Sequence, residues 1–180
     1  MRTRIILLIT LLIAFTSIAQ EKLTTKTGTV KFEASTPNFE PVAAVNKISS
    51  AILKEDGTIA VLTLVNGFQF RKALMQKHFN SKKWVNSKEF PKTSFKGKIS
   101  DFKMDDLTSE AKEYKIVGKL TFHGVTHEVT VPATISKTDG VVSLNTKFAV
   151  KVADYGIVVK SKLAAKIAET VNIDTTLELK

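Results

Sequence analysis

The feature that most constrains the fold is the segment GKLTFHGVTHEVTVPATI, residues 118–135, in which apolar and polar side chains alternate on both sides of a glycine. A period of two is typical of a β-strand with one face turned away from water. Gly124 can adopt the positive φ angle that a tight reversal needs. The segment therefore predicts a β-hairpin with its turn at residues 123–126. The first hairpin strand extends back to Tyr114, and the apolar positions of the hairpin are Tyr114, Ile116, Leu120, Phe122, Val129, Val131, Ala133 and Ile135.

Gly118 interrupts the apolar phase of the first hairpin strand. A glycine at such a position marks either a β-bulge or a place where another group approaches the backbone closely. An isolated hairpin is not stable in water. The apolar face of this hairpin must therefore pack against further strands.

Eight stretches of the chain have strand character: residues 29–34, 42–53, 58–68, 93–102, 114–122, 128–135, 141–151 and 171–179. The connections between most of them are short, which favours antiparallel neighbours. Residues 71–79 and 161–169 have helical spacing, but two short helices cannot cover eight strands. The strands must therefore pack against one another, as a sandwich or as a closed barrel. An eight-stranded barrel is filled by side chains or encloses one slender apolar ligand.

The first nineteen residues have the pattern of a cleaved signal peptide. Arg2 and Arg4 precede an apolar run over residues 5–15, and a small-x-small pattern ends at Ala19. We therefore expect a single mature domain over residues 20–180, located in the periplasm or secreted. No second long apolar run follows.

Charge and cysteine content narrow the classes of partner. Without residues 1–19, the chain keeps 25 basic and 17 acidic side chains, a formal net charge of +8. The lysines are spread along the chain, which favours a role in solubility over attraction to an anionic membrane surface. No nucleic-acid motif is present, and nucleic acid is not an expected partner. The absence of cysteine leaves the core to hold the domain together in an oxidising compartment.

Few residues could carry catalysis or bind a metal. The sequence has no cysteine, no GxSxG, no P-loop and no GxGxxG. His123 and His127 have a spacing seen in metal sites, but they flank a predicted turn without a third ligand nearby in the sequence. Asp105 and Asp106 fall in a polar connection, where solvation explains them better than catalysis. We therefore expect a protein that is not an enzyme, with no catalytic or metal-binding residues.

The aromatic side chains are strongly apolar, with eleven phenylalanines against two tyrosines and one tryptophan. Most of them are expected in an ordinary core. A subset could instead line a deep apolar cavity, because small-molecule sites are mostly apolar with few polar groups. Periodicity alone does not separate these two interpretations.

Three segments together resemble the YceI-like family of exported bacterial proteins: residues 118–135, EFPKTSFKGKI at 89–99 and FAVKVADYGI at 148–157. The most specific parts are the pattern GxLTxxGVT, which begins at Gly118, and DYGI, which begins at Asp154. RKALMQKHFN, with Arg71 and Leu74, stands where the family usually has a short helix. The resemblance implies an eight-stranded antiparallel lipocalin-like β-barrel, all-β with one or two short helices. It also implies an enclosed isoprenoid chain, such as a polyprenyl or quinone tail.

Two functions follow as hypotheses. The first is binding, storage or transport of a polyisoprenoid or similar amphiphilic lipid, with no cofactor other than a bound polyprenyl chain or isoprenoid quinone. The alternative is an envelope stress or interaction protein with a packed barrel that binds anionic envelope surfaces. A homodimer is left open. Strand phase and the family helix give the candidate ligand-binding residues as Phe32, Phe68, Phe70, Leu74, Leu120, Phe122, Phe148 and Ile157.

Overall fold

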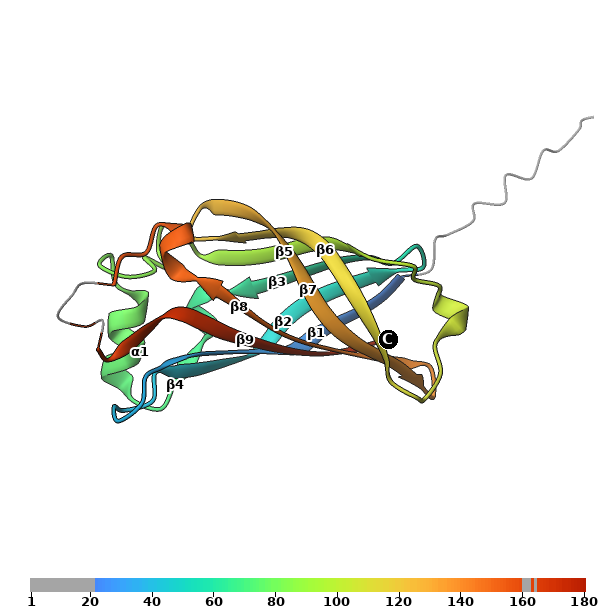
Figure 1. Cartoon of the computed structure of the whole chain (residues 1–180), viewed down its shortest axis with the longest axis horizontal. Coiled ribbons are helices and arrows are strands. Elements are labelled where there is room, and N and C mark those ends of the chain that lie inside the picture. Colours follow the sequence, from blue (N-terminus) through green and yellow to red (C-terminus); the bar gives the residue numbers. More distant parts are fainter. Residues whose placement is uncertain (1–21, 160–162, 164) are drawn as a thin grey trace, which may run out of the picture.

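The computed structural model, which describes residues 22–159, 163 and 165–180, shows a closed antiparallel β-barrel (Figure 1). Neighbouring strands in the ring are also neighbours in the sequence, and β1 closes the ring by pairing with both β2 and β9. The prediction of an eight-stranded lipocalin-like barrel is confirmed. The barrel strands are β1 (Lys22–Ser35), β2 (Ala43–Lys54), β3 (Thr58–Leu64), β5 (Lys92–Ile99), β6 (Lys112–Phe122), β7 (Val125–Thr138), β8 (Val141–Lys151) and β9 (Ile167–Leu179).

Shorter elements lie in the connections. The two-residue strand β4 (Gln69–Phe70) pairs with β2, and the helix α1 (Ala73–Asn80) follows it. Three 3₁₀ turns complete the described structure: η1 (Val65–Gly67), η2 (Met104–Asp106) and η3 (Val152–Tyr155). The prediction of a helix over residues 71–79 is confirmed within two residues at its start and one at its end.

Several predicted strand ends were wrong. Strand β1 begins seven residues earlier than predicted, because its polar first half pairs with β2 through the backbone. Strand β3 ends at Leu64, where η1 begins and the Val65 N–H donates to the carbonyl of Pro91. Strand β5 ends at Ile99, just before Asp101, whose φ is 52°.

The turn of the 118–135 hairpin is shorter than predicted. It consists of His123 and Gly124 alone, with φ angles of 50° and 78°. Two consecutive positive φ angles match the right-handed twist of the flanking strands. Val125 and Thr126 therefore already pair within β7.

The second predicted helix, residues 161–169, is partly wrong and lies partly outside the described residues. Residues 167–169 belong to β9, in which Ile167 pairs with Ser35 of β1. Residues 160–162 and 164 lie outside the described residues, as does the predicted signal peptide. Leu163 is helical as predicted, but the spacing was misleading at Ile167, because Ile167 and Val171 belong to a strand that lines the barrel interior.

Gly118 marks a close approach rather than a bulge. It pairs directly with Gly97 of β5 and with Val129 of β7, without a shift in register. A Cβ atom at Gly118 would lie 2.5 Å from the carbonyl oxygen of Lys96 and 2.8 Å from Cζ of Phe95. The two paired glycines thus leave space for the Phe95 ring inside the barrel.

The up-and-down topology places alternate connections at opposite ends of the barrel (Figure 1). We call one the helix end; it holds α1, the connections 36–42, 65–91 and 123–124, and the described residues of 152–166. The opposite end holds the connections 55–57, 100–111 and 139–140. A cluster of buried side chains fills the barrel toward the opposite end and includes Leu53, Ile99, Leu107, Ile135, Val142 and Leu179, with Phe102 and Met104 packed against it.

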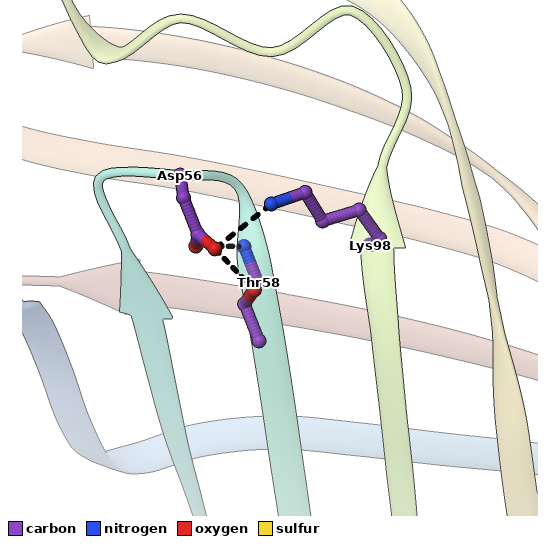
Figure 2. Close-up of polar contacts among 3 residues, drawn as sticks. All are labelled: Asp56, Thr58 and Lys98. Carbon is purple, nitrogen blue, oxygen red and sulfur yellow. Dashed lines mark hydrogen bonds and ion pairs between the residues drawn. The ribbon is translucent and has the colours of Figure 1, made fainter.

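Asp56 fixes the β2–β3 turn at the opposite end (Figure 2). Its carboxylate accepts hydrogen bonds of 2.9 Å from the backbone N–H and the hydroxyl of Thr58. The ammonium of Lys98 on β5 lies 2.9 Å from the same carboxylate. These contacts, Lys98 first, hold the pKa of Asp56 well below its usual range, because they favour the charged form.

Candidate ligand-binding cavity

The barrel encloses a cavity of about 740 Å³ between the buried cluster and the helix end. This volume lies within the range of about 300–1,000 Å³ that is typical of small-molecule sites. Its lining comes from every barrel strand except β2, whose inward side chains are buried. The deepest lining side chains include Ile59, Ile116, Val131, Leu144 and Leu177. No residue from the connections of the opposite end contributes, so the cavity opens toward the helix end.

Four phenylalanines form one aromatic cluster in the lining, near the mouth. Phe79 of α1 stacks on Phe32 of β1 at 5.4 Å between ring centroids. It also contacts Phe70 at 5.0 Å and Phe68 at 6.0 Å. The cluster therefore attaches α1 to the barrel and gives the mouth an apolar wall.

Seven of the eight candidate residues line the cavity: Phe32, Phe68, Phe70, Leu120, Phe122, Phe148 and Ile157. Leu74 does not line it, and ligand binding by these eight residues stays a prediction. Leu74 is 62% exposed, while Met75 and Phe79 of the same helix face the cavity. Helical spacing identified the helix but not the face that it turns inward.

The prediction also missed lining residues. Phe95 follows the same strand phase as Ile99 and could have been found from that phase. Phe39 and Trp84 come from connections, in which no periodic pattern shows the direction of a side chain.

Polar groups in the cavity are few and are sorted by depth. Thr63 and Thr93 lie along the wall, and their hydroxyls contact the Ser49 hydroxyl at 2.8 Å and the Thr121 carbonyl at 2.9 Å. The charged lining side chains all belong to connections at the helix end: Glu40, Lys83 and Lys166. The cavity thus suits an amphiphile whose apolar tail lies in the barrel and whose polar group stays at the mouth.

The two histidines of the hairpin bind backbone carbonyls. Nδ1 of His123 donates to the carbonyl of Tyr155 at 3.0 Å, and Nε2 of His127 donates to that of Asp154 at 2.8 Å. Gly156, with φ of 73°, ends η3 directly afterwards. These bonds hold the DYGI segment against the hairpin beside the mouth. Among the described residues there is no group of three or more metal-binding side chains.

Tyr155 packs between Phe122 and His127 and is 2% exposed. Its hydroxyl is buried and has no hydrogen-bond partner among the described residues. Burial, and next the charge of Asp154, raise the pKa of Tyr155 above its usual value of 10.0. Tyr155 is therefore held in its neutral form.

A closed eight-stranded barrel with an apolar cavity that opens at one end defines a lipocalin-like fold. The sequence profile of the YceI-like domain matches residues 16–179 of the chain. The chain therefore belongs to the YceI-like family. Among curated proteins, no sequence matches it.

Solved structures share the fold at low sequence identity. BcnA from Burkholderia cenocepacia is 20% identical, with a TM-score of 0.70, and the match covers 85% of this chain and 96% of BcnA. A polyisoprenoid-binding domain from Saccharophagus degradans is 13% identical, with a TM-score of 0.77 and coverages of 89% and 98%. The YceI protein of Campylobacter jejuni is 17% identical, with a TM-score of 0.58 and coverages of 75% and 83%.

Proposed function

We propose that this chain is a non-enzymatic binding protein that holds a polyisoprenoid or a similar amphiphilic lipid for storage or transport. The observation that carries the proposal is the apolar cavity of about 740 Å³, sealed at one end and open at the other. The fold it shares with the polyisoprenoid-binding domain of Saccharophagus degradans supports the same ligand class. The N-terminal sequence supports a place in the periplasm or outside the cell after cleavage.

The alternative function, an interaction protein with a packed barrel, requires an interior filled by side chains. The structure has an open cavity between the buried cluster and α1. The cavity favours the lipid-binding hypothesis over this alternative.

Chain length decides which ligands bind tightly. Each buried methylene contributes about 0.8 kcal/mol, so a tail with about fifteen buried carbons contributes roughly 12 kcal/mol. Association costs about 4–15 kcal/mol in lost freedom. Short apolar molecules are therefore expected to bind weakly, and affinity is expected to rise steeply with prenyl chain length until the cavity is full.

Native purification from bacterial cells tests the proposal. Organic extraction and mass spectrometry should show an isoprenoid or related lipid at about one molecule per chain, held in this cavity. A matched pair of variants on β8 checks the site: Val150 lines the cavity, and the neighbouring Ala149 is exposed outside. Val150→Trp should lower the lipid content, and Ala149→Trp should not. An empty wild-type barrel after gentle purification would overturn the proposal.

A further inference from the structure

Charged side chains are sorted between the two ends of the barrel. The described connections at the helix end carry seven basic and three acidic side chains, while those at the opposite end carry one basic and seven acidic side chains. The basic side chains at the helix end are all exposed: Arg71, Lys72, Lys77, Lys82, Lys83, Lys88 and Lys166. Six of these seven come from the single connection 65–91, whereas the acidic side chains at the opposite end come from three connections that the up-and-down topology brings together.

The basic end is also the end at which the cavity opens. Lys83, Lys166 and the exposed Phe39 all lie in the cavity lining at the mouth. The ammonium of Lys166 lies 5.9 Å from the centre of the Phe39 ring. A surface that attracts this end therefore meets the mouth directly.

Large apolar side chains are exposed at the same end. Phe39, Leu74 and Val158 lie in three different connections there, and Val158 is 77% exposed. The described connections at the opposite end expose no large apolar side chain of this kind. Exposed apolar side chains among basic ones are typical of proteins that lie on a membrane interface.

We propose that the helix end docks on an anionic lipid bilayer, with its basic side chains among the headgroups and Phe39, Leu74 and Val158 in contact with the lipid. The acidic end is repelled by the same surface, so the charge separation orients the barrel with its mouth toward the membrane. An amphiphile can then pass between bilayer and cavity without crossing water. This transfer rests on the proposed function, whereas docking does not.

Co-sedimentation with vesicles tests docking, with phosphatidylglycerol and phosphatidylethanolamine as the anionic mixture and phosphatidylcholine as the neutral reference. The triple variant Lys77→Gln, Lys82→Gln, Lys88→Gln removes three exposed charges that do not line the cavity. Each loss is expected to lower the partition coefficient about fivefold at low salt. Its control removes the same charge from the barrel wall: Lys96→Gln, Lys115→Gln, Lys119→Gln. Docking through the helix end predicts a much smaller loss for the control.

Apolar contact has a separate test. Leu74→Ser should reduce the binding that remains in about 1 M salt, where the Debye length is only about 3 Å. Leu62→Ser, on the outer face of β3, should not reduce it. Equal losses for the two lysine triples, or equal binding to anionic and neutral vesicles, would overturn the docking proposal.

The vesicle results and the lipid content separate the two proposals. A barrel purified without lipid that still binds anionic vesicles through the helix end would refute the proposed function and support docking. A lipid-loaded barrel that does not bind anionic vesicles would support the proposed function and refute docking.

Discussion

Phe79 is the side chain that attaches α1 to the barrel, and Phe79→Ala should release the helix. The substitution removes three aromatic pairs, with Phe32, Phe68 and Phe70. Each pair contributes about 0.5–1.5 kcal/mol beyond area burial. Truncation of a fully buried phenylalanine costs about 3–5 kcal/mol. Because Phe79 is only partly buried, we expect a loss of about 2–3 kcal/mol.

The loss should be local, because α1 meets the barrel mainly through this cluster. Hydrogen exchange of the α1 amides should accelerate about 30- to 150-fold, since 1.4 kcal/mol corresponds to a factor of ten. Amides of β6 and β7 should exchange at nearly the wild-type rate. In a urea titration followed by the fluorescence of Trp84, the single tryptophan, the variant should show this opening at a lower urea concentration than the wild type.

Leu74→Ala is the matched control, because Leu74 lies on the same helix but is 62% exposed. Its effect on α1 exchange should stay within about 0.5 kcal/mol. Equal acceleration by the two variants would refute the reasoning, since the aromatic cluster would then not hold the helix. Uniform acceleration throughout the barrel would refute the claim that the loss is local.

Three further predictions concern the barrel itself. Gly118→Val should lower the free energy of unfolding by about 1–3 kcal/mol, because its Cβ would meet the Lys96 carbonyl and the Phe95 ring. An unchanged midpoint of chemical denaturation would contradict this. Tyr155→Phe should preserve or raise stability, because it removes a buried hydroxyl that has no partner in the described part of the chain. Above pH 10 the unfolded chain loses the tyrosine proton while the folded chain keeps it, which destabilises the wild type; the Tyr155→Phe variant should therefore lose less stability there. The same dependence of stability on alkaline pH in both proteins would contradict the raised pKa of Tyr155. Asp56→Asn should destabilise the protein near neutral pH, and the difference should shrink below pH 3.8 as Asp56 becomes protonated; a difference independent of pH would exclude a role for its charge.

Period-two patterns predicted the strands well, because each barrel strand has one face toward the interior. Strand β8 has the predicted bounds, and its inward side chains alternate with exposed ones. The start of β1 was missed, since Lys22–Thr27 is polar and is ordered by backbone pairing with β2. Local sequence holds no information about such a partner.

The cavity was harder to predict than the barrel. Leu120 lines the cavity, whereas Leu53 and Leu179 point inward and pack in the buried cluster. Strand phase is the same in both cases. Whether an inward side chain meets space or another side chain depends on what the opposite strands and the connections contribute. The charge separation was not predicted for a related reason, because only the topology places the basic connection 65–91 and the three acidic connections at opposite ends.

Closure of the ring by β1 and β9 has a kinetic consequence. Thr29 pairs with Thr176, 147 positions later, although every other neighbouring pair of barrel strands is close in the sequence. Non-local pairing of this kind slows folding. Until this pairing forms, β1 and β9 each have an unpaired edge to which a strand of another chain can pair. The closing pair therefore decides how long each new molecule is exposed to aggregation, and substitutions along β1 and β9 should alter the yield of folded protein more than equally destabilising ones in β6 or β7.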